Sequence, residues 1–284
     1  MLKIESLNKT SFDTLYTTFN EAFKSYEVQV NKDELLVMLK RRGFVPELSF
    51  GAFENNKLVS FTLNGIGMFN GQLTAYDTGT GTIEAFSGKG IASQVFTDSI
   101  PYLKAAGISQ YLLEVLQHNT NAVSVYKKLG FIVSREFNYF KQTNTEVKLL
   151  AKDLPVTFSI KEISIDNKDR FVRFWDFNPS WQNSFEAIQR CATDFKIIGA
   201  HLKQNLVGYC IFEPNSGDIT QIAIDKGYRR IGIGSALFNE QVRCNRYPSV
   251  KAINSEITCK EMTAFMESKN IPLTGKQFEM IKKL

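Results

Sequence analysis

The sequence is poor in the residues from which metal and disulfide sites are built. It contains two histidines and four cysteines. The cysteines all lie in the second half, without Cys-x-x-Cys spacing or a neighbouring histidine cluster: Cys191, Cys210, Cys244 and Cys259. This pattern argues against a disulfide framework and against a zinc site. No metal is therefore expected.

Long apolar runs and a strong charge imbalance are also missing. No run reaches the roughly 18 apolar residues of a membrane-spanning helix, so no membrane association is expected. The N-terminal residues 1–5 contain no apolar signal region, which favours a cytoplasmic location. Net charge is +5, divided as +1 over residues 1–150 and +4 over the rest. That is too mild to predict nucleic-acid binding, although the excess, including Arg229 and Arg230, fits either a solvated surface or an anionic cofactor.

A glycine-rich turn occurs at matching places in the two halves. The two segments are Ser87-Gly88-Lys89-Gly90-Ile91-Ala92-Ser93 and Arg229-Arg230-Ile231-Gly232-Ile233-Gly234-Ser235. A strand-like run precedes each and a helical pattern follows. Small residues at such a junction let backbone N–H groups approach an anion, and the helix N-terminus adds partial positive charge. Each turn is expected to hold a phosphate, or to be a tight turn without a ligand. Neither has the Walker or the three-glycine dinucleotide fingerprint.

The first half reads as a mixture of helices and antiparallel strands. Expected helices cover residues 12–23, 90–106 and 119–129. A further helix is expected to start at Asn31, where Asn31 and Glu34 form a capping box. Expected strands cover residues 2–7, 48–54, 58–67, 76–83 and 110–115. The Asn70-Gly71 pair predicts a tight hairpin into the fourth strand, and a final hairpin runs from Phe131 to near residue 151. Two glycines in the fourth strand, Gly79 and Gly81, indicate a bulge or the close approach of a ligand.

The second half repeats this order with a period close to 142 residues, because Gly90 corresponds to Gly232. A chain of 284 residues is normal for two cores of about 140 each. A short joint at residues 152–155 separates them. The sequence therefore predicts two tandem α+β domains, residues 1–151 and 152–284, each with a mostly antiparallel twisted sheet flanked by helices.

The turns resemble the signature of the GCN5-related N-acetyltransferases, abbreviated GNAT, which is Gln/Arg-x-x-Gly-x-Gly/Ala between a strand and a helix. The second half matches it at Arg229, Gly232 and Gly234. The first half has Gly90 and Ala92, with Ser87 where the family prefers Gln or Arg. A second family motif, Asn-x-x-Ala-x-x-x-Tyr-x-x-x-Gly-Phe, is matched only in the first half, by Asn119, Ala122, Tyr126, Gly130 and Phe131. The aligned positions of the second half hold Cys259, Met262, Met266 and Asn270.

The resemblance implies acetyl-CoA as co-substrate. Its pyrophosphate would lie on the amides of residues 88–93, and its pantetheine arm between strands 76–83 and 110–115. The expected cofactor-binding residues are Thr82, Ile83, Ser87, Gly88, Lys89, Gly90, Ile91, Ala92, Ser93 and Asn119 in the first half, and Arg229, Arg230, Gly232, Gly234 and Ser235 in the second.

Acetyl transfer from a thioester to an amine needs a proton donor for the departing thiolate and a route for the proton of the amine. Tyr126, a phenol with a usual pKa of about 10, lies where the family places the donor; packing on its helix is the alternative. For the base, Glu84 is the leading candidate. Asp77 and Glu114 are the other nearby carboxylates, and transfer through water stays open.

The sequence thus predicts a tandem acetyltransferase whose first half acetylates an amine, on either a small molecule or a protein. A non-catalytic CoA-binding or regulatory protein is one alternative, because Ser87 and Met266 depart from the family pattern. A scaffold with a duplicated sheet is another. Neither the acceptor nor the oligomeric state can be predicted from these residues.

Overall fold

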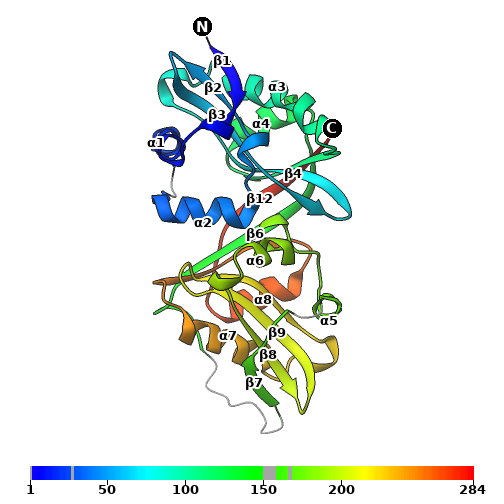
Figure 1. Cartoon of the computed structure of the whole chain (residues 1–284). Coiled ribbons are helices and arrows are strands. Elements are labelled where there is room, and N and C mark those ends of the chain that lie inside the picture. The colour runs from blue at the N-terminus through cyan, green and yellow to red at the C-terminus, as the bar shows by residue number, and fades with distance from the viewer. Residues whose placement is uncertain (1, 27–28, 150–157, 166–167) are drawn as a thin grey trace. The chain divides into compact units, whose positions relative to one another are not determined.

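The computed structural model describes residues 2–26, 29–149, 158–165 and 168–284, and the chain divides into two compact units (Figure 1). The first unit comprises Met1–Ser134 and Phe278–Leu284, and the second comprises Arg135–Gln277. The predicted boundary between residues 151 and 152, and the joint at 152–155, lie outside the described residues. The first unit is therefore built from two segments that are distant in the sequence, whereas the second unit is one continuous segment.

The first unit has a mixed sheet with helices on both faces. Its strands lie in the order β1 (Lys3–Ser6), β2 (Phe50–Glu54), β3 (Lys57–Phe69), β4 (Gln72–Thr82), β5 (Gln110–Leu116) and β12 (Leu273–Lys283), the last entering this unit at Phe278. Neighbours among β1 to β4 are antiparallel, whereas β4 and β5 are parallel. The helices are α1 (Phe12–Ala22), α2 (Lys32–Arg42), α3 (Ile91–Ala105) and α4 (Thr120–Lys128).

Local sequence signals account for the boundaries of these elements. The capping box at the start of α2 is confirmed, because the Asn31 side chain accepts from the Glu34 backbone and the Glu34 carboxylate accepts from the Asn31 backbone. The turn between β3 and β4 has positive φ at both Asn70 (49°) and Gly71 (77°). This is the geometry that Asn-Gly turns supply to a tight hairpin.

Two apolar layers hold the sheet of the first unit. On one face, α1 and α2 pack through Phe19 and Leu35 against Phe61 of β3. On the other face, Phe96 of α3 and Val123 of α4 pack in one cluster with Tyr111 of β5, and the C-terminal strand β12 adds Met280 to it. The buried members of this cluster are Ala75, Phe96, Leu103, Ile108, Tyr111, Leu113, Val115, Val123, Phe131 and Met280.

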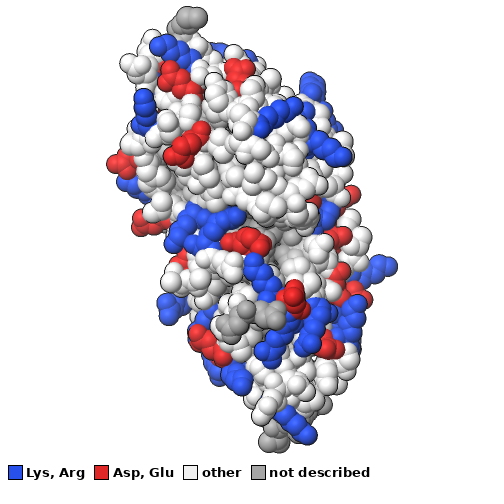
Figure 2. Space-filling model, turned by 45° about the vertical axis from the view of Figure 1, so that its right-hand side comes forward, with Lys and Arg blue, Asp and Glu red and all other residues white. Residues whose placement is uncertain are grey.

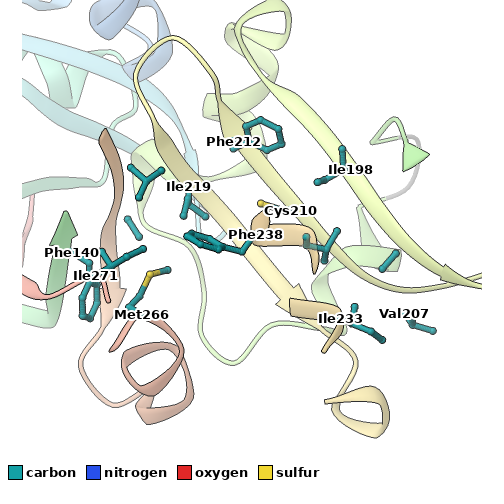
Figure 3. Close-up of a cluster of buried hydrophobic side chains, with 14 residues drawn as sticks. Phe140, Ile198, Val207, Cys210, Phe212, Ile219, Ile233, Phe238, Met266 and Ile271 are labelled. Carbon is teal, nitrogen blue, oxygen red and sulfur yellow. The ribbon is translucent and has the colours of Figure 1, made fainter. Parts of the chain in front are cut away.

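The second unit repeats the same plan. Its strands lie in the order β6 (Ile132–Thr143, from Arg135 onward), β11 (Ser249–Glu256), β10 (Asp218–Ile224), β9 (Asn205–Glu213), β8 (Lys196–Leu202) and β7 (Phe158–Glu162). The helices α7 (Ile233–Cys244) and α8 (Lys260–Ser268) contribute Phe238 and Met266 to the core drawn in Figure 3. On the other face, α5 (Asp169–Val172) and α6 (Phe185–Arg190) pack with Tyr209 of β9.

The hairpin predicted after Phe131 is wrong. Residues 132–143 form one strand, β6, which pairs antiparallel with β11, from Thr143 opposite Ser249 to Phe137 opposite Glu256. In the strand order, β12 is the neighbour of β5. An apolar pattern specifies a strand and the face it buries, but it does not specify which sheet edge the strand joins.

Charged side chains of both signs are interspersed on the face of the molecule shown in Figure 2, without one continuous basic field. No helix among the described residues is both long and apolar enough to cross a membrane.

We expect Met280→Ala to destabilise the first unit, because the side chain is fully buried in that unit's core. The loss should be about 2–5 kcal/mol, whereas Lys283→Ala, at an exposed position of the same strand, should change stability by less than about 0.5 kcal/mol. Hydrogen exchange during denaturant unfolding should show the lost protection in β5. Loss confined to β9 and β10 would contradict the assignment of the C-terminal strand to the first unit.

Candidate functional site

The central feature of the first unit is that β4 and β5 pair only briefly. Their parallel pairing covers Thr74–Tyr76 opposite Gln110–Leu112, although β4 continues to Thr82 and β5 to Leu116. The register between β3 and β4 shifts at Thr78, which confirms the predicted bulge. The Arg42 guanidinium donates to the Thr78 carbonyl over 3.1 Å. The two parallel strands thus separate beside a fixed bulge.

The two glycines of β4 admit aromatic rings from the neighbouring elements. A Cβ at Gly79 would lie 3.2 Å from the Phe19 ring, and one at Gly81 would lie 2.8 Å from Phe61 and 3.2 Å from Phe23. The close approach suspected from the sequence is therefore made by α1 and β3, on the face opposite α3 and α4.

Tyr126 and Asp77 meet where the strands separate. The Tyr126 hydroxyl donates to Asp77 Oδ2 over 3.2 Å; Thr80 Oγ1 donates to the same oxygen over 2.8 Å, and the Gly79 backbone N–H donates to Oδ1 over 2.9 Å. Burial raises the pKa of Asp77, and the hydrogen bonds and the Arg42 charge oppose that shift. Burial, followed by the Asp77 charge, raises the pKa of Tyr126 well above its usual range. Tyr126 is therefore a protonated phenol in contact with a carboxyl group of raised proton affinity.

The first glycine-rich loop is exposed between two buried anchors, Ile83 and Ile91. Gly88 and Gly90 have φ of 75° and 76°, and a Cβ at either position would meet open space. Gly90 is the N-cap of α3 and has no side chain to satisfy the first amides of the helix, those of Ile91, Ala92 and Ser93. Three further residues were predicted to bind the cofactor here. Lys89 Nζ donates to the Ala85 carbonyl, and the Thr82 hydroxyl shares a 2.7 Å hydrogen bond with the Ser60 hydroxyl. The third residue, Ser87, is exposed.

The other two predicted residues of the first half are Asn119 and Glu84. Asn119 is the N-cap of α4: its side chain accepts from the Ala122 N–H over 3.1 Å and donates to the Tyr26 hydroxyl over 2.8 Å. Glu84 is exposed in a one-turn 3₁₀ helix after β4. The carboxylate in contact with Tyr126 is that of Asp77.

The second unit contains a cavity of about 600 Å³ at the corresponding place. Its parallel strands β10 and β11 pair only at Asp218 and Lys251, and the bulge in β10 falls at Thr220, 142 residues after Thr78. The cavity is lined by β10, the 253–255 segment of β11, α8, the 175–179 segment and the second loop, which contributes Arg229, Arg230, Ile231, Gly232, Gly234 and Ser235.

The signature arginine of this loop is already engaged. Arg229 Nε donates to the Ile224 carbonyl over 3.0 Å, and its Nη2 lies 3.0 Å and 2.9 Å from the two carboxylate oxygens of Asp176. Gly232, with φ of 101°, is the N-cap of α7. A Cβ at Gly234 would lie 3.4 Å from the Phe265 ring, which is an ordinary van der Waals contact.

Met266, the position aligned with Tyr126, faces the core of the second unit. It is fully buried beside Phe140 and Ile271, as Figure 3 shows, whereas its helix neighbours Met262 and Phe265 line the cavity. Cys259, aligned with Asn119, also lines the cavity. The second unit therefore has the loop without the tyrosine.

A buried polar chain on the wall of this cavity was missed from the sequence. Trp175 Nε1 donates to the Tyr209 hydroxyl over 2.6 Å; that hydroxyl donates to Gln221 Oε1 over 2.7 Å, and Gln221 Nε2 donates to the Asn183 carbonyl over 2.6 Å. The four residues come from three separate parts of the sequence, and no local motif connects them.

Comparison with known proteins matches the acetyltransferase (GNAT) family to residues 12–131 and 161–243. A protein described as N-alpha-acetyltransferase MAK3, from Arabidopsis thaliana, is 30% identical over 96 residues, which is 34% of this chain and 50% of that protein. The match thus spans half the length of this curated relative.

Solved structures resemble the whole chain in fold. A tandem GNAT protein from the clavulanic acid biosynthesis pathway superposes with a TM-score of 0.76 at 11% identity, over 100% of this chain and 98% of that one. A GCN5-related N-acetyltransferase from Sphaerobacter thermophilus gives 0.72 at 11% identity, over 99% and 95%. The predicted fold, two GNAT-like regions with mixed sheets, is confirmed.

We expect Tyr126→Phe to raise the pKa of Asp77 further, because the carboxylate loses a donor that stabilises its charged form. Tyr111→Phe is the matched control, since its hydroxyl donates to Asn64 instead. Carbon-detected NMR titration of the Asp77 carboxyl measures both. A raised pKa means that the folded chain holds this proton more tightly, so the associated stability is present at low pH and lost as pH rises through the folded value. An unchanged Asp77 titration in Tyr126→Phe would contradict the contact.

Proposed function

The chain belongs to the acetyltransferase (GNAT) family, and from that membership we propose that its first unit transfers acetyl from acetyl-CoA to an amine by direct attack. The observation that carries this proposal is the 3.2 Å contact between Tyr126 and Asp77 at the point where β4 and β5 separate. This contact supports the proposal because it pairs a phenol that can donate a proton with a carboxyl group that can accept one.

The residues of the first loop would hold the cofactor. The amides of Gly88 to Ser93 and the N-terminus of α3 suit the pyrophosphate, because they offer exposed N–H groups without an acidic side chain among them. The pantetheine arm would lie between β4 and β5 and pair with the backbone that these strands leave unpaired beyond Tyr76 and Leu112. Thr82 and Ile83 flank this track, and Asn119 lies at the start of α4.

The reaction moves one proton from nitrogen to sulfur. A neutral amine attacks the thioester carbonyl and forms the C–N bond; the tetrahedral intermediate then collapses, breaks the C–S bond and releases the thiolate. Tyr126 protonates the sulfur. The proton lost by the nitrogen reaches Asp77, through water, and passes across the hydrogen bond to restore the phenol. Asp77 fits this role better than the exposed Glu84, because it contacts Tyr126.

A second function, binding of CoA without turnover, is favoured for the second unit by its cavity of about 600 Å³. The cavity includes the glycines of the second loop, and Met266 in the core offers no proton donor. We therefore propose a division of labour in which both loops bind the cofactor and only the first unit reacts.

The acceptor is proposed only as an amine. The N-alpha-acetyltransferase relative supports an α-amine, on a small molecule or at a protein N-terminus. A panel of free amino acids, polyamines and short peptides, assayed for released thiol, separates these classes.

We expect Tyr126→Phe to slow acetyl transfer by about 10- to 1,000-fold, while CoA affinity changes little, because the ring stays and only the donor is lost. Single-turnover rates across pH separate this chemical step from product release. An unchanged single-turnover rate would assign Tyr126 to packing alone.

We expect Gly90→Glu to abolish cofactor binding in the first unit, because it adds a carboxylate where phosphate would sit and strains a residue at φ 76°. Turnover should be lost with it. Gly232→Glu combined with Gly234→Glu is the matched variant in the second unit, and it should remove one binding event in calorimetry while turnover persists. Complete loss of transfer in that folded double variant would show that the active unit is misassigned.

A further inference from the structure

A lysine is buried beside the second glycine-rich loop. Lys269 follows α8, is only 3% exposed, and lines the cavity together with Ser235. Its Nζ donates to Ser235 Oγ over 2.6 Å. Ser235 lies in the first turn of α7, whose N-cap is Gly232. The ammonium group is therefore held at the positive end of a helix.

Within the part of the chain that the structure describes, this ammonium group contacts no carboxylate. Among the described residues, no carboxylate forms an ion pair with Lys269; its other close groups are the rings of Phe265 and Phe238, at 5.5 Å and 5.8 Å. Of the carboxylates that line the cavity, Asp176 binds Arg229, and Glu261 lies eight residues earlier on α8, about 12 Å along the axis. Burial accordingly lowers the pKa of Lys269.

The first unit uses an apolar residue at the same position. With Cys259 aligned to Asn119, Lys269 aligns with Leu129, which packs at the edge of that unit's core. A leucine or methionine would therefore satisfy the packing. A buried charge without a counterion costs free energy, and a helix N-terminus increases that cost for a cation.

We propose that Lys269 is a ligand-binding residue of the second unit, where its ammonium group and the first turn of α7 together grip the pyrophosphate of a CoA-type ligand. Arg229, the signature residue, is engaged by Asp176, so Lys269 supplies the cation on the α8 side. Lysine has three donors, and only one is used by Ser235, which leaves two for phosphate oxygens. The inference rests on the proposal that the second unit binds CoA.

The test is calorimetric binding of CoA and of pantetheine, which lacks phosphate, to the full chain carrying Gly90→Glu, so that only the second loop is intact. Lys269→Met removes the charge and keeps an apolar stem. Lys260→Met, an exposed position on the same helix, is the matched control. We expect Lys269→Met to weaken CoA about 10- to 100-fold, the effect of losing a charge-assisted hydrogen bond, and to leave pantetheine and the Lys260→Met variant within about twofold.

Thermal melting supplies an independent readout. Without ligand, Lys269→Met should melt at the same temperature as the parent or higher, because a buried charge is removed; with CoA, its gain in melting temperature should shrink. Equal weakening of CoA and pantetheine, or a lower melting temperature without ligand, would assign Lys269 to structure and overturn the inference while CoA binding stands. No CoA binding by the Gly90→Glu parent would overturn the proposal for the second unit, and this inference with it.

Discussion

The structure depends on an interruption of backbone pairing. Parallel strands usually continue their ladder, yet β4 and β5 stop pairing after Tyr76 and Leu112, and β10 and β11 pair at one position only. Buried amides and carbonyls need partners. Both units end this ladder at the same place, and it is there that we propose the pantetheine arm of the cofactor pairs with the backbone. The bulges at Thr78 and Thr220 fix where the strands diverge.

The two units have different side chains beside the point where their parallel strands separate. In the first, α4 directs Tyr126 to Asp77; in the second, α8 directs Met266 into the core and Lys269 toward the loop. In our proposal the former pair transfers protons and the latter cation retains an anion. The proposed division assigns the reaction to the first unit and ligand binding alone to the second, on sheets of the same plan.

Local signals in the sequence predicted most of the elements. The capping box at Asn31, the Asn70-Gly71 turn and the position of both glycine-rich loops before a helix each depend on a few neighbouring residues, and these features of the fold are confirmed. The pairing of β6 with β11 could not be predicted, because the apolar pattern of residues 132–143 is the same whichever strand they pair with.

Contacts between side chains that are distant in the sequence could not be predicted either. Our proposal of Asp77 instead of Glu84 as the proton acceptor depends on the contact between Asp77 and Tyr126, which are 49 positions apart. The burial of Lys269 depends on the packing of α8 against α7, and the only sequence signal for it is a lysine where the first half has Leu129.

The most direct test of the division of labour is a crystal structure of the full chain with acetyl-CoA. We predict cofactor in both units, with the thioester sulfur of the first within about 3–4 Å of the Tyr126 hydroxyl. Cofactor bound in the second unit alone, with β4 and β5 of the first unit empty, would contradict it.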